Sequence, residues 1–306
     1  MITLIVPTYS DEPGLLASLD SVQPQLAQSG IKLIVVDDCG SPLSAATIQR
    51  IEQIGRFIRL TENQGPAGAR NAGANAADTA WITYLDCGDL WLPGRGEQLT
   101  AVVRQAASAQ MFTWNALREK DGQWTHHHQR TGTQDLNEQC RGCRYQPGST
   151  LLINRQTLVE LGGYDANLRR LEDWALFVAL VAQGAGHTHL ADGKIAVTQA
   201  GGGSTANIGL AIDYLFQLLT VNPWNLNAQQ LRLARAYLWL ERAAVHKRQG
   251  GALNLLRFLT SLGRSFAALP RLRLHTQQAD QIALTNDDRR NLHALGLLTR
   301  QQADGR

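Results

Sequence analysis

The sequence has no apolar run that approaches the roughly 20 residues needed by a membrane-spanning helix. Its first residues, Met1–Tyr9, are too short for a secretory signal peptide and lack a basic start. Only four of its 306 residues are cysteine, too few for a disulfide framework in a chain of this length. These absences predict a cytoplasmic protein, in which Met1–Tyr9 supplies a first strand.

A large net charge is also missing, because the 29 Lys and Arg residues are nearly balanced by 26 Asp and Glu residues. The distribution is uneven: residues 1–209 carry 16 basic and 20 acidic side chains, whereas residues 210–306 carry 13 and 6. A basic tail can be a solvated helical face, or it can contact anionic lipid or an acidic partner. Nucleic acid is disfavoured as a partner, because the front part is acidic and no nucleic-acid-binding module is visible.

Two nucleotide-binding signatures are absent after the first apolar run. No G-x-G-x-x-G follows it, which excludes the usual dinucleotide-binding dehydrogenase. A sugar-phosphate nucleotidyltransferase would need a Gly-rich loop with Arg and Lys there. The chain instead has Asp11 and Glu12, whose negative charge would repel a triphosphate.

What the first half does contain is a regular alternation of apolar and helical segments. Strands are expected at residues 2–7, 32–37, 56–60 and 81–86, and helices at residues 13–28, 43–54 and 93–107. A Gly- and Ala-rich turn at residues 63–73 leads into a further helix. Alternating strands and helices predict a parallel sheet with both faces covered.

The pattern changes after Gln110. Strands are expected at residues 111–117, 149–153 and 194–198, with a helix at residues 171–183 and helices after about residue 208. The polar residues 120–148, with three consecutive histidines, are expected to form a mobile loop region. Residues 201–204 are expected to be a flexible lid or a plain linker.

Carboxylates follow two of the predicted strands. Asp37 and Asp38 end one apolar run, and Asp86 ends another. Parallel strands present their carboxyl ends at one sheet edge, so Asp38 and Asp86 are expected to lie near each other. Carboxylate oxygens there can accept hydrogen bonds from a nucleotide base or from ribose hydroxyls.

Five segments in order resemble the family 2 glycosyltransferases, which have the GT-A fold. They read VPTYS (6–10), VDDCGS (36–41), NQGPAGARNAG (63–73), LDCGDLWLP (85–93) and LED (171–173). The resemblance covers about residues 1–205 and implies an α/β GT-A fold, with a mostly parallel nucleotide-binding sheet flanked by helices and a C-terminal helical annex. Residues 1–207 would be the catalytic domain, with a nucleotide-sugar half at 1–109 and an acceptor half at 110–207. Residues 208–306 would be the helical region.

The resemblance implies a donor sugar carried on a nucleoside diphosphate, most simply UDP. Thr8 and Tyr9 would flank the base, and Asp38 would accept from base or ribose. The Arg70–Asn71 pair would pack under the nucleotide and organise the acidic strand tips. The donor-binding residues implied in this way are Pro7, Thr8, Tyr9, Asp38, Asn63, Gly65, Arg70 and Asp86.

The resemblance also implies a divalent cation, Mg²⁺ or Mn²⁺, but the chain departs from the family here. Gly88 stands where the family has the second carboxylate, which leaves Asp86 and Asp89 as the candidate metal ligands. A metal-independent enzyme could instead offset the phosphate charge with arginine, and Arg95, Arg141 and Arg144 are near in sequence. A third alternative is a pseudoenzyme that binds the nucleotide sugar without transferring it.

The last motif supplies the candidate catalytic acids. Inversion at the sugar C1 needs a base that takes the proton of the attacking acceptor hydroxyl. By resemblance this base is Asp173, and Glu172 orients an acceptor hydroxyl or stabilises the loop. The acceptor would be a carbohydrate or a lipid-linked glycan, with the basic tail near the inner face of the membrane.

Two weaker signals lie between these motifs. Cys140 and Cys143 form half of a zinc pattern, to which the histidines at residues 126–128 could add ligands. A surface loop, or a loop that closes over the donor, is the preferred interpretation. His187 and His189 are interpreted as ordinary polar loop residues.

Overall fold

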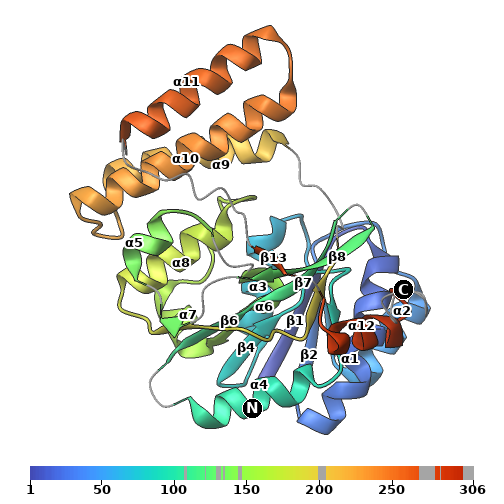
Figure 1. Ribbon diagram of the computed structural model, residues 1–306. Coiled ribbons are helices and arrows are strands. Elements are labelled where there is room, and N and C mark those ends of the chain that lie inside the picture. The colour runs from blue at the N-terminus through green and yellow to red at the C-terminus, as the bar shows by residue number, and fades with distance from the viewer. Residues whose placement is uncertain are drawn as a thin grey trace.

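The computed structural model describes residues 1–106, 109–120, 122–128, 132–133, 135–143, 147–198, 205–268, 280–282 and 284–298. Two sheets lie in the lower part of the molecule and are covered by helices, while a helical layer projects above them (Figure 1). The predicted lid at residues 201–204 lies outside the described residues.

The larger sheet has eight strands in the order β3-β2-β1-β4-β10-β6-β11-β9. Its first four strands are parallel, and β10 then runs antiparallel between β4 and β6. The strands are β1 (Ile2–Thr8), β2 (Lys32–Asp37), β3 (Arg56–Arg59), β4 (Trp81–Tyr84), β6 (Met111–Trp114), β9 (Gly132–Thr133), β10 (Leu152–Asn154) and β11 (His187–Leu190). The parallel half is the one predicted from the alternating pattern.

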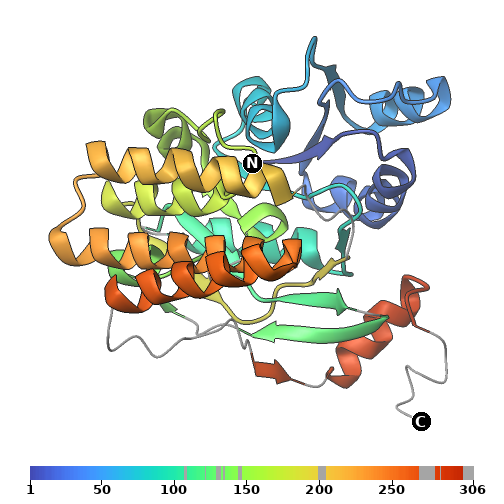
Figure 2. The ribbon, with the colours of Figure 1, turned by 90° about the horizontal axis from the view of Figure 1, so that it is seen from above.

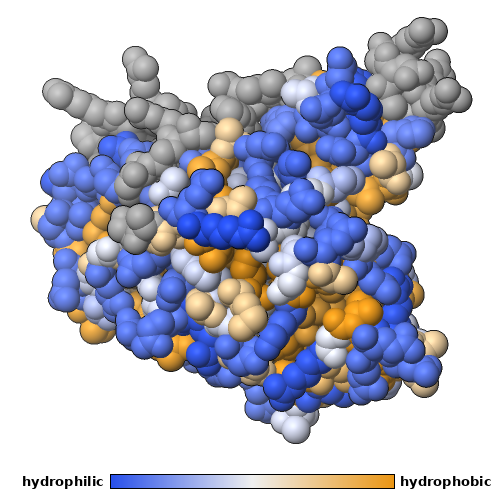
Figure 3. All heavy atoms as spheres, turned by 90° about the horizontal axis from the view of Figure 1, so that it is seen from below, coloured by the Kyte–Doolittle hydropathy of each residue, from blue (hydrophilic) through white to orange (hydrophobic). Residues whose placement is uncertain are grey.

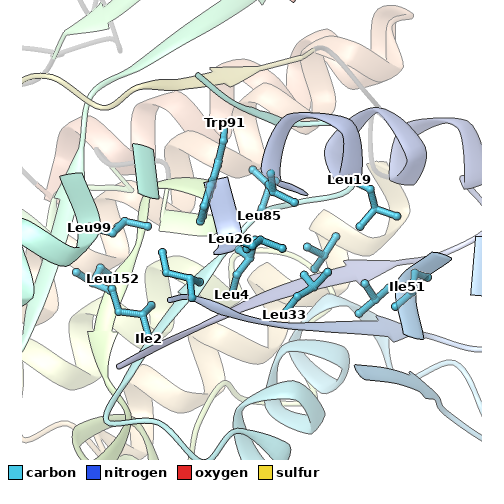
Figure 4. Close-up of a cluster of buried hydrophobic side chains, with 14 of the residues drawn as sticks. Ile2, Leu4, Leu19, Leu26, Leu33, Ile51, Leu85, Trp91, Leu99 and Leu152 are labelled. Atoms are coloured by element: carbon cyan, nitrogen blue, oxygen red, sulfur yellow. The ribbon is translucent and has the colours of Figure 1, made fainter. Parts of the chain in front are cut away.

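Helices cover both faces of this sheet, as the apolar residues of the central strands require. The apolar side chains of β1 alternate: Leu4 and Val6 pack into one core, and Ile5 packs into the other. The first core contains α1 (Glu12–Ser29), α2 (Ala45–Ile54) and α4 (Arg95–Gln105). The second contains α3 (Gly65–Ala76), α7 (Arg155–Leu161) and α8 (Glu172–Ala182). Figure 4 shows the first core, with Leu4, Leu33 and Leu85 beneath Trp91.

Backbone hydrogen bonds hold the carboxyl ends of the central strands together. The Asp38 amide donates to the Thr8 carbonyl at 2.9 Å, and the Leu85 amide donates to the Ile5 carbonyl at 3.0 Å. The segments that follow β1, β2 and β4 therefore leave the sheet side by side. This edge of the sheet is where the sequence placed its polar motifs.

A second sheet has the order β13-β8-β7-β12-β5. Its strands are β5 (Leu90–Trp91), β7 (Ala116–Lys120), β8 (Gln123–His128), β12 (Ile195–Val197) and β13 (Asp280–Ile282). The single strand expected at residues 111–117 is thus divided at Asn115 between the two sheets. The expectation of a loop throughout residues 120–148 is wrong, because it includes β8, β9, α5 (Leu136–Cys140) and the short α6 (Pro147–Thr150). The hairpin β7–β8 was missed because its residues are mostly polar.

Two further expectations need correction. The strand expected at residues 149–153 begins later, because Ser149 and Thr150 belong to α6. His187 and His189 are not loop residues: they point inward from β11, and both bond to the Thr113 hydroxyl, at 2.7 and 2.8 Å. A hydroxyl between two imidazoles satisfies their polarity, so histidines can stay inside a core.

The C-terminal region consists of α9 (Thr205–Val221), α10 (Ala228–Gln249), α11 (Ala252–Ala268) and α12 (Asn286–Ala294). Residues of α9 and α10 share an apolar core with α5 and α8, and Figure 2 shows these helices lying across the molecule beside α8. β13 and α12 return to the second sheet, where Leu292 packs into a small core with Leu90 and Leu117. The division between residues 207 and 208 stays a prediction.

One face of the molecule shows how polar and apolar residues are distributed on the surface. Seen from below the view of Figure 1, hydrophilic residues predominate and hydrophobic ones form separate patches (Figure 3). In the described part of the chain, no helix combines the length and apolar character of a membrane span.

The packing of α3 on β1 gives a test of the fold. A Cβ at Gly73 would lie 2.4 Å from Cγ2 of the buried Ile5. Gly73→Ala should therefore lower the free energy of unfolding by about 1–3 kcal/mol from overpacking, although alanine favours the helix by about 1 kcal/mol. Gly209 on α9 has open space around it, so Gly209→Ala should be neutral or stabilising. Urea denaturation of both variants measures the difference, and equal effects would contradict the close packing.

Candidate functional site

A cleft of about 740 Å³ opens at the carboxyl edge of the larger sheet. Its wall is built from segments that are far apart in sequence. The lining residues are Pro7, Thr8, Tyr9, Asp38, Asn63, Gly65, Pro66, Ala69, Arg70, Asp86, Cys87, Arg169, Arg170, Glu172, Asp173 and Asn207. The donor-binding and catalytic residues proposed from the sequence are all in this lining, and of the two proposed metal ligands Asp86 is in it and Asp89 is not.

Arg70 is the charge centre of the cleft. Its side chain is only 4% exposed, and it donates to Asp86 Oδ1 at 2.7 Å and to Glu172 Oε1 at 3.0 Å. A third carboxylate oxygen, Asp173 Oδ1, lies 3.7 Å from Arg70 Nη1. One buried guanidinium on α3 thus gathers the carboxylates that follow β4 and begin α8.

The balance of burial and pairing decides the charge of Arg70. Burial alone would lower the pKa of Arg70, but the carboxylates of Asp86, Asp173 and Glu172 hold it well above its ordinary value. Arg70 is therefore a permanent cation. A cation–π contact also stabilises Arg70, since its guanidinium lies 5.4 Å from the ring centre of Tyr164.

Asp38 holds the beginning of α3. Its carboxylate accepts from the Gln64 amide at 2.7 Å, the Gly65 amide at 2.8 Å and the Asn63 side chain at 2.9 Å. These donors are the backbone and side-chain groups that a helix start leaves available. Burial raises the pKa of Asp38, and the bonds from Gln64 and Gly65 oppose the rise.

Asp37, the neighbour of Asp38, turns away from the cleft. It is ion-paired with Arg59 and accepts from the Gly40 amide at 3.1 Å. Asp37 therefore stabilises the loop after β2, and Asp38 is the residue of the pair that reaches the cleft.

The two acids at the start of α8 have different surroundings. Glu172 is bonded directly to Arg70, whereas Asp173 Oδ1 lacks a hydrogen-bond partner among the described residues. Burial raises the pKa of Asp173 to about 7, with Arg70 opposing the rise and the charges of Glu172 and Asp86 adding to it. Asp173 can consequently bind and release a proton near neutral pH.

The structure places the two candidate metal ligands, Asp86 and Asp89, in different surroundings. The Asp86 side chain is 43% exposed and faces the cleft. Asp89 is buried, where it accepts from the Ser149 hydroxyl and, at 3.0 Å, from the Thr198 amide. Burial and the nearby Asp86 charge raise the pKa of Asp89 well above its usual range. Asp89 therefore supports the loop from inside.

The cleft residues supply only part of a binding site for a divalent cation. No cluster of three His, Cys, Asp or Glu side chains suited to a metal occurs among the residues that the structure describes. Asp86 alone of the predicted pair presents a carboxylate to the cleft. One carboxylate together with substrate phosphates is, however, a usual arrangement for Mg²⁺.

The cations at the cleft are not those suggested by sequence proximity. Arg95 is buried 4.1 Å from the Trp114 ring centre, Arg141 pairs with Glu138, and Arg144 lies outside the described residues. Arg169 and Arg170, which the sequence reasoning missed, line the cleft. Their position directly before the LED motif was the available signal.

Among the residues that the structure describes, no group of metal ligands surrounds the half zinc pattern of Cys140 and Cys143. Cys140 is fully buried in the core between α5 and α8, and burial raises the pKa of its thiol to about 12. A zinc site needs thiolates, which this environment disfavours. His126 pairs with Asp288 on α12.

Removing Arg70 tests its role as the charge centre. Arg70→Gln leaves buried carboxylates without their counter-ion, so unfolding free energy at pH 8 should fall by about 3–5 kcal/mol. The loss should shrink toward pH 5, because Asp173, whose pKa is raised to about 7 by burial, is then protonated and neutral. The matched variant is Arg169→Gln, an exposed arginine of the same cleft, which should change stability by less than about 0.5 kcal/mol. Equal losses in urea titrations would contradict the assignment.

Comparisons with known proteins identify the family of the chain. The model of the family described as "Glycosyl transferase family 2" matches residues 3–162. An uncharacterized glycosyltransferase of Haemophilus influenzae is 27% identical over 190 residues, which are 60% of this chain and 63% of that protein. The Escherichia coli protein named UDP-Glc:alpha-D-GlcNAc-diphosphoundecaprenol beta-1,3-glucosyltransferase WfgD is 31% identical over 100 residues, 32% of this chain and 38% of that protein. The chain thus spans less than two thirds of either relative.

A solved structure supports the fold. S. aureus TarS 1-349, determined in complex with UDP-GlcNAc, superposes with a TM-score of 0.67 at 15% identity, covering 88% of this chain and 81% of that chain. The predicted GT-A fold with a helical C-terminal region is confirmed. Because the family model matches more than half of the sequence, the chain belongs to glycosyl transferase family 2.

Proposed function

We propose that this glycosyltransferase moves a sugar from a UDP-sugar to an acceptor hydroxyl, with inversion at C1. The observation that carries the proposal is the set of carboxylates around Arg70, in the cleft that also contains Asp38. Carboxylates that follow β4 and begin α8 meet on one cation there. The unbonded oxygen that Asp173 keeps in the same cluster supports a site for chemistry.

The donor would lie with its nucleoside between Tyr9 and Asp38. Tyr9 is 56% exposed at the cleft, so its ring face is available to a base. Asp38 has used much of its acceptor capacity on α3, which leaves few positions for ribose or base donors. Pro7, Thr8 and Asn63 complete this part of the proposed donor site.

The diphosphate charge would be offset by Arg169 and Arg170. Arg70 already faces three carboxylates, so little of its charge remains for the donor. Arg169 is held in place by two bonds to Asn63, one to the side chain and one to the backbone carbonyl at 2.9 Å. An arginine fixed in this way can bind phosphate oxygens through its other N–H groups.

Asp173 would act as the base. As the acceptor oxygen forms its bond to C1, Asp173 takes the hydroxyl proton, and the bond from C1 to the diphosphate oxygen breaks with its electron pair leaving on UDP. Attack opposite the leaving group inverts C1. A base with a pKa near the operating pH is the effective choice, and the surroundings of Asp173 bring its pKa to about 7.

A divalent cation, Mg²⁺ or Mn²⁺, would be held by Asp86 and the donor phosphates. When bound, it would stabilise the charge of the departing diphosphate. Asp89 would take no part in binding it, because its oxygens are already engaged with Ser149 and Thr198.

The acceptor proposed is a lipid-linked glycan. The name of the Escherichia coli relative describes a sugar on diphosphoundecaprenol, and the basic C-terminal region suits an acceptor at a membrane surface. The alternative is a pseudoenzyme that binds UDP-sugar without transfer, for which Gly88 is the motivating residue.

Replacing the base tests the reaction. Asp173→Asn should lower kcat about 10²- to 10⁴-fold, the usual contribution of a general base, while UDP binding stays within a few-fold. In the parent, kcat/KM should fall about tenfold per pH unit below pH 7, because the protonated acid cannot accept a proton. Transfer is measured by UDP release from a panel of nucleotide sugars first selected by thermal shift.

Stability provides a second readout on the same variant. The pKa of Asp173 is raised in the folded state, so its charge destabilises the fold above pH 7 and this loss is recovered as pH falls toward 4. Asp173→Asn should therefore unfold at higher urea than the parent at pH 8. The exposed Asp20→Asn serves as the control for both measurements. An active Asp173→Asn enzyme would overturn the base assignment, and UDP binding without turnover of any donor would favour the pseudoenzyme.

The proposed metal site predicts different effects for substitutions of Asp86 and Asp89. Asp86→Asn should raise the Mn²⁺ concentration needed for half-maximal activity about 10- to 100-fold, as loss of a metal-site contact does. Asp89→Asn should change it less than about threefold, since the buried residue is not expected at the metal. Activity is titrated with Mn²⁺ after EDTA treatment. Full activity in EDTA would show that arginines alone offset the phosphate charge.

A further inference from the structure

Helix α11 turns its apolar side toward solvent. Leu255, Leu256, Leu259 and Phe266 are between 39% and 62% exposed, and they fall on one face at helical spacing. Leu262, which is partly buried, and Gly263 lie on the same side of the helix. A surface helix in a globular protein normally buries such a face.

The face of α11 that packs on α10 is centred on two serines. Ser261 and Ser265 are the buried residues of the helix, and the Ser265 hydroxyl donates to the Ala236 carbonyl at 2.9 Å. Phe258 and Leu262 are partly buried, whereas the other four leucines of the helix are exposed. Most of the leucine side chains of α11 therefore face solvent.

Positive charge lies beside the apolar face. Within α10 and α11 there are seven Arg and Lys residues and one Glu. A groove of about 420 Å³ between the two helices is lined by Arg242, Arg257 and Arg264, together with Trp239, His246, Leu256, Thr260 and Ser261. Arg264 lies 4.6 Å from the ring centre of Trp239, which fixes the guanidinium at the groove.

We propose that α11 lies in the surface of an anionic phospholipid bilayer, with its leucines among the acyl chains and the groove arginines at the lipid phosphates. An exposed apolar face with basic residues along its edge is the pattern of helices that bind at membrane interfaces. Charge decides against a second copy of the chain, because a face-to-face pair of α11 helices would bring basic flanks together.

The position of the hairpin suits this arrangement. α10 and α11 stand at the end of the molecule opposite the N-terminal residue (Figure 1). Their neighbour α9 carries Asn207, which lines the cleft. Helices α10 and α9 would therefore lie between a bilayer at α11 and the cleft. The proposal does not depend on the transfer reaction, since membrane binding is measured without donor or acceptor.

Flotation with vesicles tests the proposal on the full chain. The parent should float with vesicles of phosphatidylcholine containing about one third phosphatidylglycerol, and bind pure phosphatidylcholine at least about tenfold less. The double variant Leu255→Glu and Leu259→Glu should lose binding about tenfold or more. These side chains are exposed, so folding should be unaffected, which circular dichroism and thermal unfolding verify.

Matched variants distinguish the contribution of the α11 leucines from that of the groove arginines. Leu210→Glu, an exposed leucine of α9, should bind like the parent. Arg257→Gln with Arg264→Gln should remove the preference for phosphatidylglycerol, whereas Arg232→Gln, an exposed arginine of α10, should preserve most of it. Equal binding by the parent and the double Glu variant, or no preference for anionic vesicles, would overturn the proposal. A parent dimer that the Glu variant converts to monomers, without vesicle binding, would assign the face to a second copy instead.

Discussion

The arrangement of the cleft depends on one buried cation. Arg70 lies on α3, and the carboxylates that it gathers come from the segment after β4 and from the first turn of α8. Asp38 fixes the start of the same helix through three hydrogen bonds. α3 is thus tied to β2 at its N-terminus and to β4 and α8 at Arg70. The spacing of the acidic groups follows from these two attachments, since the start of the helix and Arg70 in its middle cannot shift independently.

The same cluster shows that the fold tolerates a local cost at the proposed base. Glu172 is paired and only 10% exposed, but Asp173 next to it is incompletely bonded and has a raised pKa. A chain shaped by stability alone would place a neutral residue there. Asp89 differs from Asp173, because its buried carboxylate accepts hydrogen bonds from the Ser149 hydroxyl and the Thr198 amide.

The sequence predicted most of the parallel sheet, because buried strands with polar ends and helices with capping residues leave a local pattern. It also identified residues of the cleft wall, such as Asp38 and Asp86, from motif order. It could not tell that Asp89 turns inward, since that depends on Ser149, sixty residues away. The polar hairpin β7–β8 was missed, and the direction of the α11 leucines was left open, for a related reason. Their environment is set by tertiary neighbours, and hydrophobic period alone does not reveal which face is covered.

The pairing of β13 with β8 has a consequence for how the chain can be divided. β8 lies between β7 and β13, so a shortened protein ending before Asp280 would carry β8 as an open edge strand. Unpaired edges attract other chains and promote aggregation. The distal segment therefore protects the second sheet, and a homologue without such a segment must shield this strand by another means, such as charge, a bulge or a covering loop.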